Sequence, residues 1–205
     1  MAKRSAPEVN AGSMADIAFL LLIFFLVTTT IETDSGINRK LPPIQDEKEP
    51  PPPLKEKNIF IVLINSNGDL LVEDKPMKLK NLKTAAAQFL DNGGGVGDEA
   101  CNYCRGPKDP SSSDNPVKAV ISLQNNRLTK YSDYIAVQNE LVAAYNELRD
   151  REAKRLYGVT FKEMEEGFKS DNYSGSKDNL KKRIEIIQDM YPQKLSEAEP
   201  KRTSN

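Results

Sequence analysis

The sequence predicts an α+β protein with a single N-terminal transmembrane helix, a proline-rich linker and a small two-layer domain of sheet and helices. Three observations support this: one apolar run, a proline-rich stretch after it, and strand-like and helix-like patterns that follow each other from residue 58. We divide the chain into a tail (1–12), a span (13–31), a linker (32–57), a domain (58–148) with a loop insertion (91–116), and a charged extension (149–205).

The run Met14–Ile31 has the length of one membrane span. Its 18 residues would rise about 27 Å as a helix, close to the ~30 Å of bilayer hydrocarbon. Apart from Asp16, no ionisable residue lies between Glu8 and Glu32. A carboxylate costs up to about 2.5–3.5 kcal/mol at the centre of such a helix, so membrane proteins tend to keep one only where it has a role. Asp16 is therefore a candidate carrier of an ion or a proton.

Two other interpretations of this segment remain open. Ser13 and Asp16 have the spacing of a capping box, in which both side chains bond free N–H groups of the first helical turn. Such a cap would not exclude proton carriage. Lys3 and Arg4 before an apolar run also fit a cleaved signal peptide, although no A-x-A-like site follows the run.

Helical geometry predicts the surroundings of Asp16. Residues three or four positions apart share one helix face. The residues expected on the Asp16 face are Phe19, Leu20, Ile23, Val27 and Thr30. The carboxyl group is thus flanked by apolar groups and then by a hydroxyl, which suits a mostly dry, gated site better than an open aqueous one.

Composition excludes several classes of function. The net charge is -1, and no block of like charge is long enough to bind a nucleic-acid backbone, so nucleic acid is not an expected partner. The chain has no histidine and no tryptophan, which removes a histidine general base and most zinc sites. We expect no metal, no cofactor and no enzymatic activity.

The two cysteines form a C-x-x-C, Cys101 to Cys104, within a stretch rich in Gly, Pro and Ser. Two thiolates do not complete a tetrahedral zinc site, and the chain has no second pair. A thiol oxidoreductase remains an alternative, but such a motif normally lies at a strand-to-helix junction. We expect instead a local disulfide that tightens a surface loop in an oxidising compartment.

The linker and the domain are read from local patterns. Prolines around Pro42 and Pro50–Pro53 predict an extended polyproline II linker. Strands are expected at Asn58–Asn65, Asp69–Glu73 and Val117–Leu123, with an Asn67-Gly68 turn between the first two. Helices are expected at Lys80–Leu90 and from Ser132 onward. The second helix has an amphipathic face that would cover a sheet, formed by Tyr134, Val137, Leu141, Tyr145 and Leu148.

The extension is harder to interpret. Residues 149–183 are highly charged and are interrupted by glycines, so we expect solvated helix and loop. Arg183–Asp189 fits one last strand or a short helix, and we expect Ser196–Pro200 to be disordered.

The ordered set of motifs resembles the ExbD/TolR family of proton-driven energy-transduction proteins. Asn10 lies six residues before Asp16, with Ser13 between them, and a Leu/Ile/Phe-rich span follows. Leu41-Pro42 resembles the family's Leu-Pro after the membrane, and Asn58–Ile61 with Asn67-Gly68 resembles its first periplasmic hairpin. The family's usual proline between Asn and Asp is absent, and residues 91–116 and 149–183 have the character of insertions.

The resemblance implies an inner-membrane protein that crosses the membrane once, with a cytoplasmic N-terminus and a periplasmic domain. Two copies of the span would lie inside a pore formed by an ExbB- or TolQ-like multi-span subunit, and Asp16 would take up and release protons. Force would then pass through the linker to a TonB- or TolA-like protein that serves outer-membrane import. Two alternatives remain: a TolR-like subunit for envelope integrity, and a membrane-anchored periplasmic binding protein in which Asp16 only caps its helix.

Overall fold

The computed structural model describes residues 11–28 and 54–198. The chain divides into two units, residues 1–39 and 40–205, and each is considered by itself. The first unit contributes one helix, α1 (Ala11–Thr28), to the described residues. The second contains all five strands and the four other α-helices.

The sheet of the second unit has five strands in the order β3-β2-β1-β4-β5. Their bounds are β1 Ile59–Ile64, β2 Leu70–Val72, β3 Lys75–Met77, β4 Val120–Asn125 and β5 Leu195–Ala198. β1 runs antiparallel to β2 and parallel to β4, while β5 runs parallel to β4. β1 is therefore the central strand, and the chain enters it directly from a short 3-10 turn, Glu56–Asn58.

The turn between β1 and β2 explains their register. The Asn65 side-chain oxygen accepts hydrogen bonds from the backbone N–H groups of Asn67 (2.9 Å) and Asp69 (2.8 Å). Gly68 has φ 86°, a left-handed conformation that glycine adopts without the steric penalty of a side chain. The turn pairs Ile64 with Leu70, so that the apolar residues of both strands share one face.

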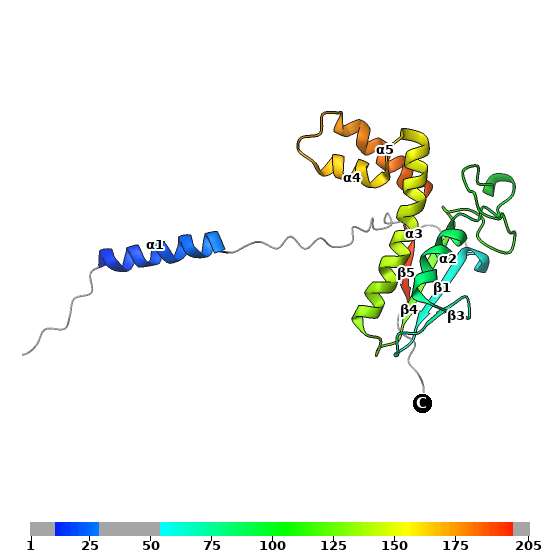
Figure 1. Cartoon of the computed structure of the whole chain (residues 1–205), viewed down its shortest axis with the longest axis horizontal. Coiled ribbons are helices and arrows are strands. Elements are labelled where there is room, and N and C mark those ends of the chain that lie inside the picture. Colours follow the sequence, from blue (N-terminus) through cyan, green and yellow to red (C-terminus); the bar gives the residue numbers. More distant parts are fainter. Residues whose placement is uncertain (1–10, 29–53, 199–205) are drawn as a thin grey trace, which may run out of the picture. The chain divides into compact units, whose positions relative to one another are not determined.

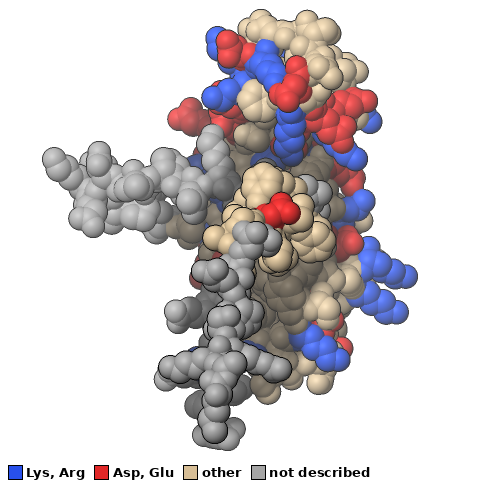
Figure 2. All heavy atoms as spheres, turned by 90° about the vertical axis from the view of Figure 1, so that its left-hand side faces the viewer, with Lys and Arg blue, Asp and Glu red and all other residues tan. Residues whose placement is uncertain are grey.

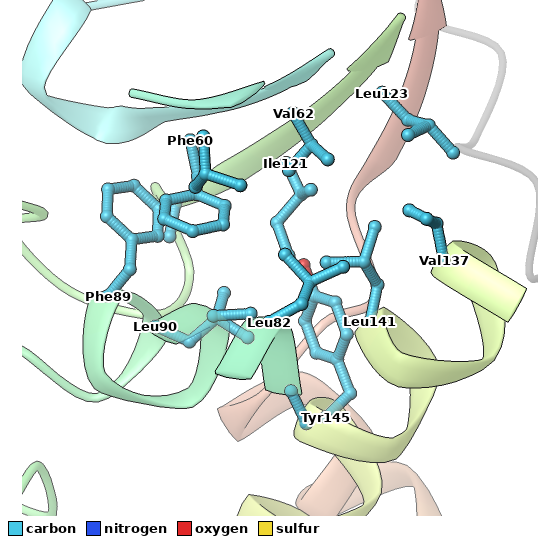
Figure 3. Close-up of a cluster of buried hydrophobic side chains, with 14 of the residues drawn as sticks. Phe60, Val62, Leu82, Phe89, Leu90, Ile121, Leu123, Val137, Leu141 and Tyr145 are labelled. Carbon is cyan, nitrogen blue, oxygen red and sulfur yellow. The ribbon is translucent and has the colours of Figure 1, made fainter. Parts of the chain in front are cut away.

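Helices α2 (Leu79–Leu90) and α3 (Tyr131–Tyr157) cover that face (Figure 1). Alternate side chains of β1 and β4 point toward apolar side chains of the two helices (Figure 3). The members of this core that are at most 1% exposed are Val62, Leu82, Ala86, Leu90, Ala119, Ile121, Leu123, Leu141, Ala144, Tyr145 and Tyr191. Burial of a Leu, Ile or Val side chain contributes about 1.5–3 kcal/mol, so this face supplies most of the fold's stability.

A second apolar cluster lies beyond the sheet. α4 (Phe161–Lys169) and α5 (Lys177–Met190) pack against the end of α3 (Figure 1). The buried side chains that form the cluster are Ala153, Phe161, Met164, Leu180, Ile184 and Ile187. The outside of these helices carries basic and acidic side chains intermixed (Figure 2).

Local signals fix the ends of these helices. A capping box of Thr160 and Glu163 starts α4, and the Ser176 hydroxyl accepts the backbone N–H of Asn179 at the start of α5. Gly158 ends α3 in a left-handed conformation, with φ 75°.

The structure confirms the α+β class and differs from the sequence-based expectations in its C-terminal part. Residues 149–183 form helix and loop and are mostly exposed, as expected, but Ala153, Phe161, Met164 and Leu180 are buried in the second cluster. Arg183–Asp189 lies inside α5, in keeping with the helical alternative for this segment. β5 includes residues 196–198, which were expected to be disordered. α3 runs through the expected boundary between residues 148 and 149. The predicted linker, residues 32–57, lies largely outside the described residues.

Candidate functional site

α1 carries one ionisable side chain, Asp16, among otherwise apolar or small residues. Asp16 is exposed on the isolated helix. Phe19, Leu20 and Ile23 follow it at spacings of three, four and seven, so they share its side of the helix. Their side chains are 61%, 59% and 41% exposed, respectively.

Other residues singled out from the sequence are only partly described. The side chain of Val27 and the whole of Asn10, Thr30, Leu41 and Pro42 lie outside the described residues. Of the helices in residues 11–28 and 54–198, none combines the length and the apolar character that crossing a membrane requires.

The first turn of α1 bears on the capping-box alternative. α1 begins at Ala11. Ser13 is therefore inside the first turn and not at the N-cap position that a capping box with Asp16 needs.

The second unit has a buried polar contact at its N-terminal entry. Asn58, the residue before β1, is 2% exposed and Asp114 is 1% exposed. The Asn58 amide donates a hydrogen bond to the Asp114 carboxylate (3.0 Å), and its carbonyl oxygen accepts the Asp114 backbone N–H (2.8 Å). The two residues are 56 positions apart in the chain, so no local pattern pointed to this contact.

Lysines complete this contact. The Lys57 ammonium lies 2.5 Å from one Asp114 oxygen, and the Lys55 ammonium lies 3.3 Å from the other. Lys55 also pairs with Glu99 at 2.9 Å, and Glu99 pairs with Lys118. Burial would raise the pKa of Asp114, but hydrogen bonds from the Lys57 and Asn58 side chains lower it well below its usual range.

The loop 91–116 that carries these acids is anchored on the end of α2. The Asn92 side chain donates to the carbonyl oxygens of Asp109 and Ser113 (both 2.8 Å) and accepts the Asp109 backbone N–H (3.0 Å). The Ser113 hydroxyl donates to the Phe89 carbonyl at 2.6 Å. A Cβ atom on Gly94 would lie 2.1 Å from the Asp109 carbonyl oxygen, so this close approach requires glycine.

A disulfide joins Cys101 and Cys104 in this loop. Both cysteines are buried, 7% and 8% exposed, although the loop around them was expected to lie at the surface. Tyr103, between them, donates its hydroxyl to the Met190 carbonyl (2.8 Å) and stacks edge to face on Tyr191. Burial raises the pKa of Tyr103 to about 12.

A second polar network ties the C-terminal segment to the core. The Asp91 carboxylate accepts two hydrogen bonds from Arg151 (2.6 and 2.8 Å) and one from the Tyr191 hydroxyl (2.7 Å). Arg149 donates two hydrogen bonds to the Tyr191 carbonyl (3.0 and 2.7 Å), and Arg151 also pairs with the fully buried Glu152. The Asp91 contact raises the pKa of Arg151. The charged groups of this network hydrogen-bond to one another or to the Tyr191 hydroxyl and carbonyl, so we assign the network a structural role.

The described part of the second unit contains no group of three or more His, Cys, Asp or Glu side chains that could hold a metal ion. Its acids near the entry are paired with lysines or amides. The contact between Asn58 and Asp114 was not predicted from the sequence, where the only available signal was a polar residue directly before a buried strand.

Comparison with known proteins gives two findings. The family described as Biopolymer transport protein ExbD/TolR matches residues 2–149, which include α1, the first four strands and most of α3. The curated protein Biopolymer transport protein exbD2 of Vibrio cholerae is 24% identical over 88 residues. That match covers 43% of this chain and 62% of the relative, so the chain spans less than two thirds of it. Because the family match extends over more than half of the sequence, the chain belongs to the ExbD/TolR family.

Proposed function

We propose that this chain is the proton-carrying, single-span subunit of an inner-membrane complex that uses the proton-motive force to move a periplasmic partner. The observation that carries the proposal is Asp16, the one ionisable side chain of α1. Family membership supports the general role, and the name of the Vibrio cholerae relative favours transport over envelope integrity.

The surface of α1 supports a membrane location. Its large apolar side chains with described exposure are 41–73% exposed and lie on every side of the helix. A helix that is apolar all round is stable only when something apolar covers it. The Thr28 hydroxyl donates to the Phe24 carbonyl (2.7 Å), which satisfies a polar group that could not bond to lipid. We propose that the span is Met14–Ile31, whose last three residues lie beyond the described part of the helix.

The mechanism follows from the cost of a charge in an apolar surrounding. A carboxyl group there can be held neutral in one position and ionised in another, so proton uptake and release change which neighbours it prefers. Each proton that crosses 100 mV supplies about 2.3 kcal/mol. In our proposal two copies of α1 sit in a pore made by an ExbB- or TolQ-like subunit, and titration of Asp16 moves them.

Force would then pass along residues 29–53 to the second unit. From there it would reach a TonB- or TolA-like periplasmic protein. The sheet and the helices that cover it share one close-packed apolar core, which suits a part that transmits force.

The test is Asp16→Asn, which keeps the shape of the side chain and removes its ionisation. We expect loss of energised uptake in cells that depend on this chain, with normal expression and normal co-purification of the multi-span subunit. Asp16→Glu should retain part of the activity because it still ionises. Asp98→Asn, at an exposed acid of the second unit, is the matched control and should be fully active. Full activity of Asp16→Asn would contradict proton carriage and favour an anchored binding protein.

A further inference from the structure

The place where the chain enters the second unit is held by a distant loop. Residues 55–58, which we call the entry segment, lie between the chain that leads from α1 and the central strand β1. Any pull that arrives along the chain from its N-terminal side meets these four residues before it meets the sheet.

The entry segment has few contacts of its own with the sheet. Within it, the Asn58 backbone N–H donates to the Lys55 carbonyl (2.9 Å), which closes the 3-10 turn. Its side-chain bonds go to loop 91–116: Asn58 and Lys57 bond Asp114, Lys55 bonds Glu99 and Asp114, and Lys57 also donates to the Pro110 carbonyl (3.1 Å). Three of the four residues in the entry segment, Lys55, Lys57 and Asn58, therefore depend on one loop for their side-chain contacts.

The loop is firmly attached at its other end. The backbone N–H groups of Gly94 and Gly95 donate to the carbonyls of Ser113 and Asp114 (2.9 and 2.8 Å). The Asn92 and Ser113 side chains fix the same strand of the loop to the end of α2. Figure 1 shows the loop beside the start of β1. The Asp114 carbonyl is thus held by Gly95, and its neighbour Ser113 is bonded to the end of α2. The Asp114 side chain and its backbone N–H hold the entry segment.

We propose that loop 91–116 is a latch, in which Asp114 clamps the entry segment to the end of α2. Closed, the latch delivers tension in the preceding chain to α2 as well as to β1. Open, it frees four residues, which span at most about 13–14 Å when fully extended, so the reach of the second unit grows by less than that. The source of the tension rests on the proposed function, but the clamp itself does not.

The geometry favours a latch over an ordinary core contact. Asp114 and Asn58 are buried, whereas the Lys55 and Lys57 side chains are 53% and 29% exposed. The apolar core contains none of these four residues. The contact can therefore open while the packing of β1, α2 and α3 stays intact.

The first experiment measures hydrogen exchange by mass spectrometry on the full-length chain in detergent. Asp114→Ala should speed exchange of the amides in residues 54–60 by about tenfold or more, because it removes charge-assisted bonds that close the segment. Residues 135–148 of α3 should keep their protection. Asp98→Ala, in the same loop but exposed, is the matched control and should change neither region.

A second variant is needed in case the chain does not fold without the Asp114 carboxylate. Lys55→Ala with Lys57→Ala removes the exposed half of the latch and leaves the buried Asn58 contact. It should speed exchange in residues 54–60 by a smaller factor than Asp114→Ala. Unchanged exchange there in both variants would overturn the latch. Faster exchange throughout the chain in both would also overturn it, since the contact would then hold the whole fold.

The functional arm compares these variants with Asp16→Asn in cells. If the latch delivers force, both latch variants lower energised uptake while the complex still assembles. Normal uptake with the expected change in exchange would show that the latch opens without a role in force transfer, which contradicts this part of the proposal. Full uptake by Asp16→Asn would refute the proposed function instead, so the two failures are distinguishable.

Discussion

Replacing Arg151 by Met tests how the C-terminal segment is joined to the core. The guanidinium donates two hydrogen bonds to Asp91, one to the Tyr191 hydroxyl (2.8 Å) and one to Glu152 (3.1 Å). Methionine keeps much of the apolar stem and removes the charge. Asp91 is 6% exposed and Glu152 is 0% exposed, so both carboxylates lose a cation in a poorly solvated place.

The magnitude follows from these contacts. Removing one partner of a buried ion pair costs about 3–5 kcal/mol, because the remaining charge is left uncompensated. The Arg151 side chain is 24% exposed, and both acids keep other partners, Tyr191 for Asp91 and Arg155 for Glu152. We therefore expect the lower end, about 3 kcal/mol, or a fall in Tm of roughly 6–12 °C for a domain of this size.

The assay is urea denaturation of the fragment 54–205, followed by circular dichroism. Arg105→Met is the matched control, since the Arg105 side chain is exposed and only its backbone N–H contacts Asp91 (3.2 Å). It should change the free energy of unfolding by less than about 0.5 kcal/mol. Tyr191→Phe should couple to Arg151→Met in a double-mutant cycle by about 0.5–3 kcal/mol. If Arg151→Met is as stable as Arg105→Met, the network does not secure the C-terminal segment.

Three further outcomes can be measured. Changing Cys101 and Cys104 to Ser should lower the free energy of unfolding of the 54–205 fragment by about 2 kcal/mol through the loss of ring closure, and further because two hydroxyl groups are placed at buried sites. Energised uptake should stay intact. Loss of uptake in a folded variant would reveal a redox or docking role. The pKa of Asp114 is lowered in the folded state, so ionised Asp114 contributes stability above its unfolded pKa of about 3.9, and this contribution is lost as pH falls below that value. Asp114→Asn should therefore flatten the decline in the free energy of unfolding between about pH 5 and pH 2. Parallel curves for the variant and the unchanged chain would contradict this. Protease added to spheroplasts should digest residues 32–205 and spare a small membrane fragment, whereas full protection would reverse the proposed topology.

Local sequence patterns predicted the turns and helices that are determined by residues within the element itself. The Asn67-Gly68 turn is found where its sequence indicated, because the turn conformation depends on Gly68 itself. α2 begins at Leu79, one residue from the expected start, and the amphipathic spacing of α3 places Val137, Leu141 and Tyr145 in the core. The periodicity of apolar residues indicates which face of a helix is buried, and it was sufficient to predict the buried face of α3.

Elements whose stability comes from distant partners escaped prediction. β3 also escaped prediction although its partner β2 is close in the chain, because β3 has three residues, one of them proline, and the turn before it, Glu73-Asp74, contains no glycine. β5 is stabilised by its pairing with β4, more than 70 residues earlier in the chain. The Asn58 contact with Asp114 is of the same kind. For β5 and for the Asn58 contact, the nearby sequence carries no signal of the partner.

The charged extension was misjudged for a different reason. Its charged residues suggested solvent, but two of them are buried: Glu152 pairs with Arg151 and Arg155, and Arg149 lies over the Phe161 ring at 5.4 Å. Burial lowers the pKa of Arg149, and two hydrogen bonds to the Tyr191 carbonyl offset the loss of solvent. A buried charge is tolerated where its hydrogen bonds are satisfied, so mean charge is a poor guide to burial in such a segment. The apolar positions of α5, Leu180, Ile184 and Ile187, had the helical spacing that indicates a buried face. Periodicity, rather than composition, was the informative signal in this part of the chain.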